Sequence, residues 1–266
     1  MSKLLIGKRG IIFGALDDKS IAWKTAQKVY EHGGKFVLSN APTALRLGKI
    51  NDLAAACNAE IIGADATNVE ELTTLITRSQ DILEGKLDFV LHSIGMSPNV
   101  RKEKPYTDLN YDYYLKTLDI SALSLHKLLH VCYKMDALNQ WASVVALTYI
   151  AAQRTFPQYS DMAEAKSTLE SIARSFGYHY GVKNKVRVNT ISQSPTMTTA
   201  GSGVSGFDKF FDYADKMSPL GNASAEACAD YCVVMFSDLT RYVTMQNLFH
   251  DGGFSNMGIS ESAMNA

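Results

Sequence analysis

Short apolar runs alternate with longer amphipathic stretches along most of the chain. Seven of the runs predict strands, and several are apolar at consecutive positions, which is typical of strands covered on both faces. These runs are Gly10–Phe13, Lys35–Ser39, Glu60–Gly63, Leu87–His92, Ala142–Leu147, Val186–Ile191 and Asn247–His250. The stretches between them have the apolar spacing of helices, namely Ile21–Glu31, Thr43–Cys57, Val69–Leu83, Asp112–Met135, Met162–Tyr180 and Ala225–Phe236.

This repeated alternation predicts an α/β fold: a single Rossmann-like, doubly wound parallel sheet of about seven strands with helices on both faces. No internal repeat, low-complexity tract or Pro/Gly-rich linker divides the 266 residues, so we expect one domain over 1–266. Ligands of such sheets bind beyond the carboxyl ends of the strands. Functional residues are therefore expected directly after the predicted strands.

Composition narrows the classes of partner. Hydrophobic residues make up 46% of the chain, enough for a sizeable packed core. The 26 basic residues are balanced by 27 acidic ones, which argues against nucleic acid as a partner. Neither a basic amphipathic stretch nor an apolar run of 18 residues is present, so no membrane association is expected.

The first residues and the cysteines indicate a cytoplasmic protein. The opening MSKLLIGKRGIIFG is broken by Lys8 and Arg9 and lacks the apolar core of a signal peptide. The four cysteines are Cys57, Cys132, Cys228 and Cys232, and none belongs to a CxxC pair. Unpaired cysteines fit a reducing compartment, and the lack of clustered ligands predicts no metal site.

The turn after the first strand resembles a phosphate-binding turn. Gly14 permits a tight turn, and Ser20 can cap the helix that starts at Ile21. A pyrophosphate would then lie against the N–H groups at the helix start. The later glycines of G-x-G-x-x-G are missing, so an ordinary strand–helix turn is the alternative.

The residues that follow the second and third predicted strands indicate which dinucleotide would bind. The second strand runs into Ser39-Asn40-Ala41, with no carboxylate for the ribose hydroxyls and no adjacent base for a 2′-phosphate; Arg46 is the nearest. This favours NADH over NADPH. After the third strand, Asp65-Ala66 either meets the adenine amino group or forms an ordinary turn.

Small residues follow the fourth strand, where Ser93 and Gly95 would let a flat ligand approach the backbone. His92, taken alone, is interpreted as a packed or capping histidine.

A tyrosine and a lysine follow the fifth strand. Pro157 suits a helix entry, and if the helix is running by Tyr159, Lys166 lies on the same face about 10 Å further along. A phenol can donate to an oxygen that gains negative charge, and a nearby ammonium favours that anion and can hold a ribose hydroxyl. A tyrosine at a helix start with an unrelated surface lysine is the alternative.

The spacing of the pair discriminates between reactions. Ala163 stands four residues after Tyr159, so the Tyr-x3-Lys pattern of short-chain ketone reductases is absent. Tyr-x6-Lys with Tyr149 ten residues upstream resembles the enoyl-acyl carrier protein reductases of bacterial fatty-acid synthesis, in the short-chain dehydrogenase/reductase superfamily. The likeness runs from Gly7 to Phe254, with further landmarks at His92-Ser93-Ile94-Gly95, Val186-Arg187-Val188-Asn189 and Asp251-Gly252-Gly253-Phe254.

The resemblance implies a hydride transfer from NADH to C3 of a trans-2-enoyl thioester on acyl carrier protein, by a homotetramer. Tyr159 would stabilise the enolate oxygen, Lys166 would hold the nicotinamide ribose, and Tyr149 would lie beside the thioester. Met96 and Met162, with the two tyrosines, would bind substrate. The dinucleotide contacts implied are Gly14, Ser20, Ile21, Asp65, Ala66, Ser93, Gly95, Lys166 and Thr196.

The sequence departs from the family pattern in three places. Gln193-Ser194-Pro195 replaces Ala-Gly-Pro, so Ser194 adds bulk beside the expected nicotinamide. Asn40-Ala41 replaces longer polar residues near the adenosine. Asp208 stands beside Lys209 where bases usually meet the carrier protein, which would move carrier docking to Arg154 or Lys183.

The stretch 196–213, with Gly201, Gly203 and Gly206, is interpreted as a mobile substrate-binding loop, with an inert surface loop as the alternative. Two other functions stay open at this point: a short-chain 3-oxoacyl or ketone reductase, and a non-catalytic dinucleotide-binding protein.

Overall fold

The computed structural model describes residues 3–46, 49–199, 201 and 206–265. Its strands form one sheet in the order β3-β2-β1-β4-β5-β6-β7, and every neighbouring pair is parallel. The strands are β1 Arg9–Phe13, β2 Lys35–Ser39, β3 Glu60–Ile61, β4 Leu87–His92, β5 Leu138–Thr148, β6 Arg187–Gln193 and β7 Asn247–His250. The predicted doubly wound sheet is confirmed.

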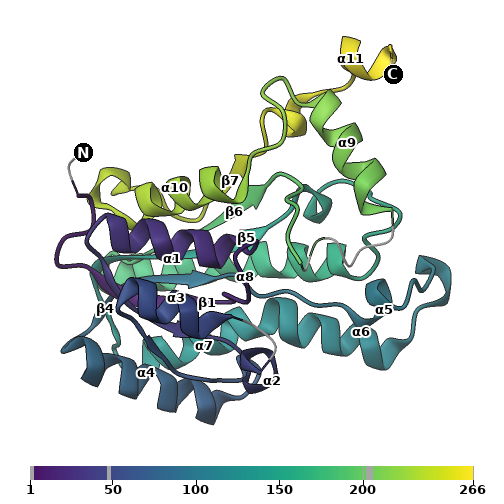
Figure 1. Ribbon diagram of the computed structural model, residues 1–266. Coiled ribbons are helices and arrows are strands. Elements are labelled where there is room, and N and C mark those ends of the chain that lie inside the picture. The colour runs from purple at the N-terminus through teal and green to yellow at the C-terminus, as the bar shows by residue number, and fades with distance from the viewer. Residues whose placement is uncertain (1–2, 47–48, 200, 202–205, 266) are drawn as a thin grey trace.

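Helices cover both faces of the sheet (Figure 1). The α-helices are α1 Ile21–Glu31, α2 Pro42–Leu45, α3 Ile50–Cys57, α4 Val69–Leu83, α5 Pro98–Arg101, α6 Tyr111–Leu118, α7 Ser124–Lys134, α8 Met162–Asn184, α9 Phe207–Met217, α10 Ala225–Phe236 and α11 Glu261–Met264. Successive strand residues point to opposite faces. Ile12 therefore packs in the layer of α1, α3 and α10, while Ile11 and Phe13 pack in the layer of α4, α7 and α8.

Two predicted helices are interrupted. The stretch predicted over Asp112–Met135 contains a π-helical turn, η2, at Asp119–Leu123 between α6 and α7. The stretch predicted over Thr43–Cys57 is divided between α2 and α3. Lys49 lies outside the helical region, and its N–H donates to the Leu16 carbonyl (3.1 Å) instead of continuing a helix.

The second part of the stretch 196–213, expected to be a loop, is helical. Residues 207–213 belong to α9, whose apolar Phe207, Phe210, Ala214 and Met217 recur at helical spacing. The loop prediction rested on Gly201, Gly203 and Gly206, which precede this periodic segment. Residues 200 and 202–205 of the predicted loop lie outside the described residues, and the mobility of the remainder stays a prediction.

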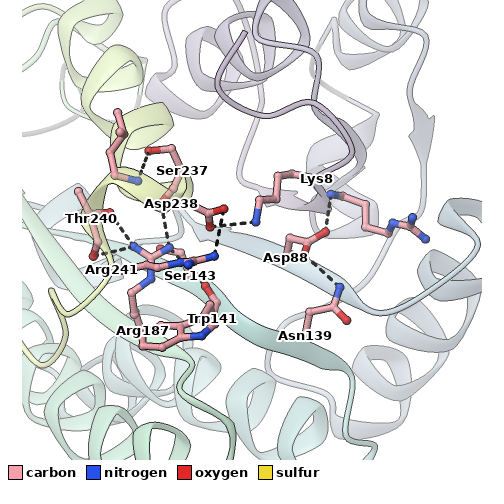
Figure 2. A network of polar contacts seen from close by, with 12 residues as sticks. Lys8, Asp88, Asn139, Trp141, Ser143, Arg187, Ser237, Asp238, Thr240 and Arg241 are labelled. Atoms are coloured by element: carbon pink, nitrogen blue, oxygen red, sulfur yellow. Dashed lines mark hydrogen bonds and ion pairs between the residues drawn. The ribbon is translucent and has the colours of Figure 1, made fainter.

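A buried arginine anchors the amino-terminal edge of the sheet (Figure 2). Arg187, at the start of β6, is 2% exposed, and its guanidinium donates to the carbonyls of Met235 (3.0 Å), Ser237 (3.2 Å) and Thr240 (3.1 Å). It also reaches the Trp141 carbonyl at 3.4 Å. These bonds tie the end of α10 to the sheet at the edge opposite the carboxyl ends, so Arg187 has a structural role.

Among the described residues, no helix is both long and apolar enough to cross a membrane. The same residues contain no group of three His, Cys, Asp or Glu side chains arranged to hold a metal ion. All four cysteines are buried free thiols.

Candidate active site

The carboxyl ends of β4, β5 and β6 open onto a cavity of about 330 Å³. The three strands are neighbours in the sheet, so the segments that follow them meet at one edge. Nine of the residues singled out from the sequence line this cavity: Ile21, Ser93, Gly95, Met96, Tyr149, Tyr159, Met162, Lys166 and Thr196. Four do not: Gly14, Ser20, Asp65 and Ala66.

Tyr159 is not on the helix that carries Lys166, which corrects the geometry expected from the sequence. It lies in a turn, and α8 begins only at Met162. Ser160 between them has φ +50°, a left-handed conformation that cannot continue a right-handed helix. Both side chains nevertheless line the same cavity. Burial raises the pKa of the Tyr159 phenol well above its ordinary value, so this group is a proton donor at neutral pH.

Lys166 lies in the first turns of α8 and is 7% exposed. Its ammonium donates to the Leu147 carbonyl at 2.8 Å, at the carboxyl end of β5. Burial lowers the pKa of this lysine to about 8, and the nearby Glu170 carboxylate partly opposes the shift. The Glu170 carboxylate in turn accepts from Thr148 (2.9 Å) and Asn247 (3.2 Å).

Tyr149 follows β5 and packs against Tyr159 with ring centroids 5.1 Å apart. It is 8% exposed, and its hydroxyl has no hydrogen-bond partner among the described residues. Burial raises the pKa of this phenol strongly, with the neighbouring Tyr159 as a further cause. A buried hydroxyl without a partner, on a residue that lines a cavity, is a candidate to bond a ligand there.

The sequence analysis missed an aromatic wall. Phe156 packs against Phe210 (5.1 Å) and Tyr149 (5.4 Å) between ring centroids, and Phe207 also lines the cavity. Together these rings make the substrate end of the cavity apolar. The apolar spacing within α9 was the available signal, but only the tertiary fold brings α9 over residues 149–159.

The space between β1 and β4 is shaped by close backbone packing. Gly14 has φ +95°, and a Cβ placed there would lie 2.0 Å from the Ser93 carbonyl oxygen. Ser20 caps α1 by accepting from the Trp23 N–H (3.3 Å). Ile21, the first residue of α1, lines the cavity, so the N-terminus of this helix is directed at the site and favours a bound phosphate.

Gly95 and the two methionines define the other wall. A Cβ on Gly95 would lie 3.5 Å from the Lys166 ammonium nitrogen and 3.6 Å from the Met162 methyl carbon. The Met96 backbone is fixed by Ser121, whose hydroxyl accepts from the Met96 N–H (2.9 Å) and donates to its carbonyl (3.0 Å). A flat ring can therefore approach the Gly95 backbone while sulfur-containing side chains close the sides.

The residues expected near an adenosine lie outside the cavity. The Asp65 carboxylate accepts from the backbone N–H and hydroxyl of Thr67 (2.9 and 2.8 Å), as in an ordinary turn. The Asn40 amide donates to the Ala15 carbonyl (3.0 Å). Ala66 is buried in the core. These bonds give Asp65 a local structural role, and its contact with adenine stays a prediction.

Three further positions have structural partners. His92 is fully buried, bonds Ser124 (2.9 Å) and has its pKa lowered to about 3 by burial, so it is a neutral packed histidine. Ser194 lines the cavity, and its hydroxyl accepts from the Ala223 N–H (3.0 Å). Lys183 lies at the far end of α8, where it pairs with Asp136 (3.4 Å).

Comparisons with known proteins agree with this geometry. The chain is 59% identical to the FabI of a FabI–NADH complex from Alistipes finegoldii, with a TM-score of 0.98 over 99% of this chain and 93% of that one. It is 31% identical to enoyl-[acyl-carrier-protein] reductase [NADH] 1 of Rhizobium meliloti, over 97% of this chain and 94% of the relative. It is also 31% identical to the FabI enoyl-[acyl-carrier-protein] reductase [NADH] of Rickettsia bellii, over 96% of each.

The model of the family described as Enoyl-(Acyl carrier protein) reductase matches residues 14–255. That range contains the whole cavity, the Tyr149–Tyr159–Lys166 set and six complete strands. The resemblance drawn from the sequence is confirmed, and the chain belongs to the enoyl-(acyl carrier protein) reductase family.

Proposed function

We propose that the chain reduces the double bond of trans-2-enoyl thioesters on acyl carrier protein, with NADH as the reductant. Family membership gives the reaction class, and NADH appears in the names of the relatives above. The observation that carries the proposal is that Tyr159, Lys166 and Tyr149 line one largely apolar cavity at the carboxyl edge of the sheet. Bound NADH supplies a hydride to C3 of the substrate.

Lys166 is suited to hold the nicotinamide ribose. An ammonium has three donors, and one of them is used by the Leu147 carbonyl. Two remain for ribose hydroxyls beside Gly95, where a Cβ would lie 3.5 Å from the ammonium nitrogen, so the lack of a side chain leaves that space open. The lysine thus binds and orients, and its charge also favours negative charge on a neighbouring oxygen.

Tyr159 is suited to stabilise the enolate. Reduction at C3 moves electrons onto the thioester oxygen, and a phenol with a raised pKa keeps its proton to donate there. The Tyr149 hydroxyl lies in the same aromatic cluster without a partner among the described residues, and we assign it to the thioester side of the acyl pocket. Met96 and Met162 line the pocket on either side.

NADH fits this chain better than NADPH. The residues after β2 offer an asparagine that is already bonded to Ala15 and an alanine, so no positive charge stands next to the strand end. A 2′-phosphate would need such a charge. Arg46, at the end of α2, is the nearest base in the sequence.

The decisive assay follows NADH and NADPH oxidation in parallel with a crotonyl thioester and a 3-oxoacyl thioester. Crotonyl turnover with NADH supports the proposal, and turnover of only the 3-oxo compound contradicts it. Tyr159→Phe should lower kcat on the order of a hundredfold because it removes one donor to the developing oxyanion. A Tyr159→Phe rate within a few-fold of the original would refute the assigned role.

We further propose that residues 1–266 act as one reductase domain in a cytoplasmic homotetramer. Apolar side chains are exposed on the outer faces of the long helices, including Leu115, Leu123, Tyr178 and Val182. Exposed apolar side chains of this kind suit burial between copies of the chain. Light scattering at several protein concentrations tests the assembly.

For carrier docking, Arg154 remains a candidate near the cavity, whereas Lys183 is ion-paired with Asp136.

A further inference from the structure

We propose that Asp161 is a positioning residue for Tyr159, because it clamps the turn that carries the phenol to the segment after β4 that also lines the cavity. The inference rests on the function proposed for Tyr159. Asp161 lies two residues after Tyr159, just before α8, and is fully buried. It does not line the cavity, so it acts through the residues that do.

The Asp161 carboxylate accepts three hydrogen bonds from other parts of the chain. One oxygen accepts from the Ser97 hydroxyl at 2.6 Å. The other accepts from the Asn99 amide and the Thr117 hydroxyl, each at 2.8 Å. These donors come from the segment after β4, from α5 and from α6. Burying a carboxylate is costly without such partners, so the site is built around this side chain.

The orientation of Asn99 follows from the carboxylate. A carboxylate accepts and cannot donate, so the amide nitrogen of Asn99 must face it. The same nitrogen donates to the Asn110 carbonyl, and the Asn99 oxygen accepts from the Asn110 N–H, both at 3.1 Å. Asp161 therefore fixes the register between α5 and the start of α6, in addition to its own turn.

The turn held by Asp161 contains a strained residue. Ser160 has φ +50°, which costs a non-glycine residue about 1 kcal/mol and persists only where the surroundings enforce it. The Tyr159 carbonyl accepts from the Met162 N–H (3.2 Å), and the Asp161 carbonyl accepts from the Ala165 N–H (3.2 Å). Asp161 thus holds the residue that follows the strained Ser160, and Tyr159 is the residue that precedes it.

The bonds of Asp161 extend to a second segment that lines the cavity. Ser97, which donates to Asp161, directly follows Met96, whose backbone is held by Ser121 in the π-helical turn. Met96, Ser97 and Tyr159 all line the cavity. The bonds to one carboxylate therefore connect the turn that carries the phenol to the segment that carries Met96. A shift of about 1 Å in such a group can lower a rate on the order of a hundredfold.

Asp161→Asn tests the clamp with almost no change in volume. Its amide offers only one acceptor oxygen. If that oxygen keeps the bonds from Asn99 and Thr117, the NH2 group meets the Ser97 hydroxyl, which can no longer donate there; in the other orientation the NH2 group meets the Asn99 amide, a donor against a donor. We expect kcat to fall at least tenfold, with the Kd for NADH unchanged within twofold because Lys166 and Gly95 keep their places. Asp112→Asn, the same chemical change at an exposed position of α6, should leave both values unaltered.

A double-mutant cycle with Tyr159→Phe separates positioning from a general structural effect. If Asp161 acts through the phenol, Asp161→Asn adds no further loss in the Tyr159→Phe background. If the two losses multiply, the inference is overturned. A Tyr159→Phe enzyme of normal rate would instead refute the proposed function, so the two failures are distinguishable.

Ser97→Ala and Thr117→Val provide a second route if Asp161→Asn does not fold. Each removes one donor and leaves the carboxylate and its remaining bonds in place. We expect a smaller loss of kcat for each, again absent in the Tyr159→Phe background. Normal kcat in both single variants would overturn the inference.

Discussion

The Lys166 ammonium nitrogen lies 2.8 Å from the carbonyl oxygen of Leu147, the next-to-last residue of β5. This bond fastens α8 to the sheet at the edge where the cavity opens. The lysine is therefore placed by the end of a strand and not by Tyr159, which lies in a separate turn. Tyr159 and Lys166, seven residues apart, line the same cavity because the turn presents the phenol and the helix presents the ammonium.

Binding of NADH should weaken as the pH rises from about 7 to 9. Burial lowers the pKa of Lys166 from 10.5 to about 8, so the folded protein loses this positive charge over that range. A neutral amine binds ribose hydroxyls and nearby phosphates less well. Fluorescence titration of NADH at several pH values measures the effect.

Tyr159→Phe is the control for this pH dependence. In the unsubstituted protein the Tyr159 phenol has a raised pKa and stays protonated below pH 10. Removing it should therefore leave the decline in NADH affinity unchanged. Affinity that is flat between pH 7 and 9.5 would show that Lys166 does not carry the dependence.

Tyr149→Phe should stabilise the ligand-free protein or leave its stability unchanged while it slows turnover. The hydroxyl is buried without a partner among the described residues, and such a group costs about 1–3 kcal/mol. Removing it relieves that cost but deletes the donor assigned to the thioester. Thermal unfolding and kcat/KM for a crotonyl thioester are to be measured together; a clear loss of stability would show that the hydroxyl has a structural partner.

Gly14→Ala should destabilise the protein by at least about 2 kcal/mol, because it combines a strained φ of +95° with a Cβ that would lie 2.0 Å from the Ser93 carbonyl oxygen. NADH binding should be lost as the β1–α1 turn moves. Gly181→Ala is the matched control, since a Cβ there meets nothing within 4 Å on helix α8. That change should stabilise by about 0.5–1 kcal/mol. Urea unfolding of both variants measures the two changes in the free energy of unfolding. Equal changes for Gly14→Ala and Gly181→Ala would contradict the prediction.

His92 should make the protein less stable in mild acid. Burial lowers the pKa of His92 from 6.5 to about 3, so below pH 6.5 the unfolded chain binds a proton that the folded chain does not. The contribution of His92 to the free energy of unfolding is fully present above pH 6.5. It falls as the pH drops toward 3, by up to about 1.4 kcal/mol per pH unit. His92→Asn, compared by urea unfolding at pH 6.5, 5.5 and 4.5, should show a shallower decline. Parallel declines would contradict the assignment.

The sequence predicted the sheet, most helices and the chemical pair, because these depend on local periodicity and on one topological rule. Parallel strands joined by right-handed crossovers place their carboxyl ends at one edge. Residues that follow β4, β5 and β6 therefore had to lie near one another, and Tyr149, Tyr159 and Lys166 do line one cavity. The bounds of α1, α4 and α10 were also predicted correctly from apolar spacing.

The tertiary structure alone decided how the site is held. Ser160 takes a left-handed conformation that keeps Tyr159 off the helix, and nothing in the local pattern requires this. Phe210 reaches Phe156 across 54 positions of sequence, and Asp161 is buried because donors 44 to 64 residues away meet it. Asp65, for which the sequence left both an adenine contact and an ordinary turn open, is bonded to Thr67. Local spacing determined which side chains arrive at the edge, whereas long-range contacts determined their orientation, burial and partners.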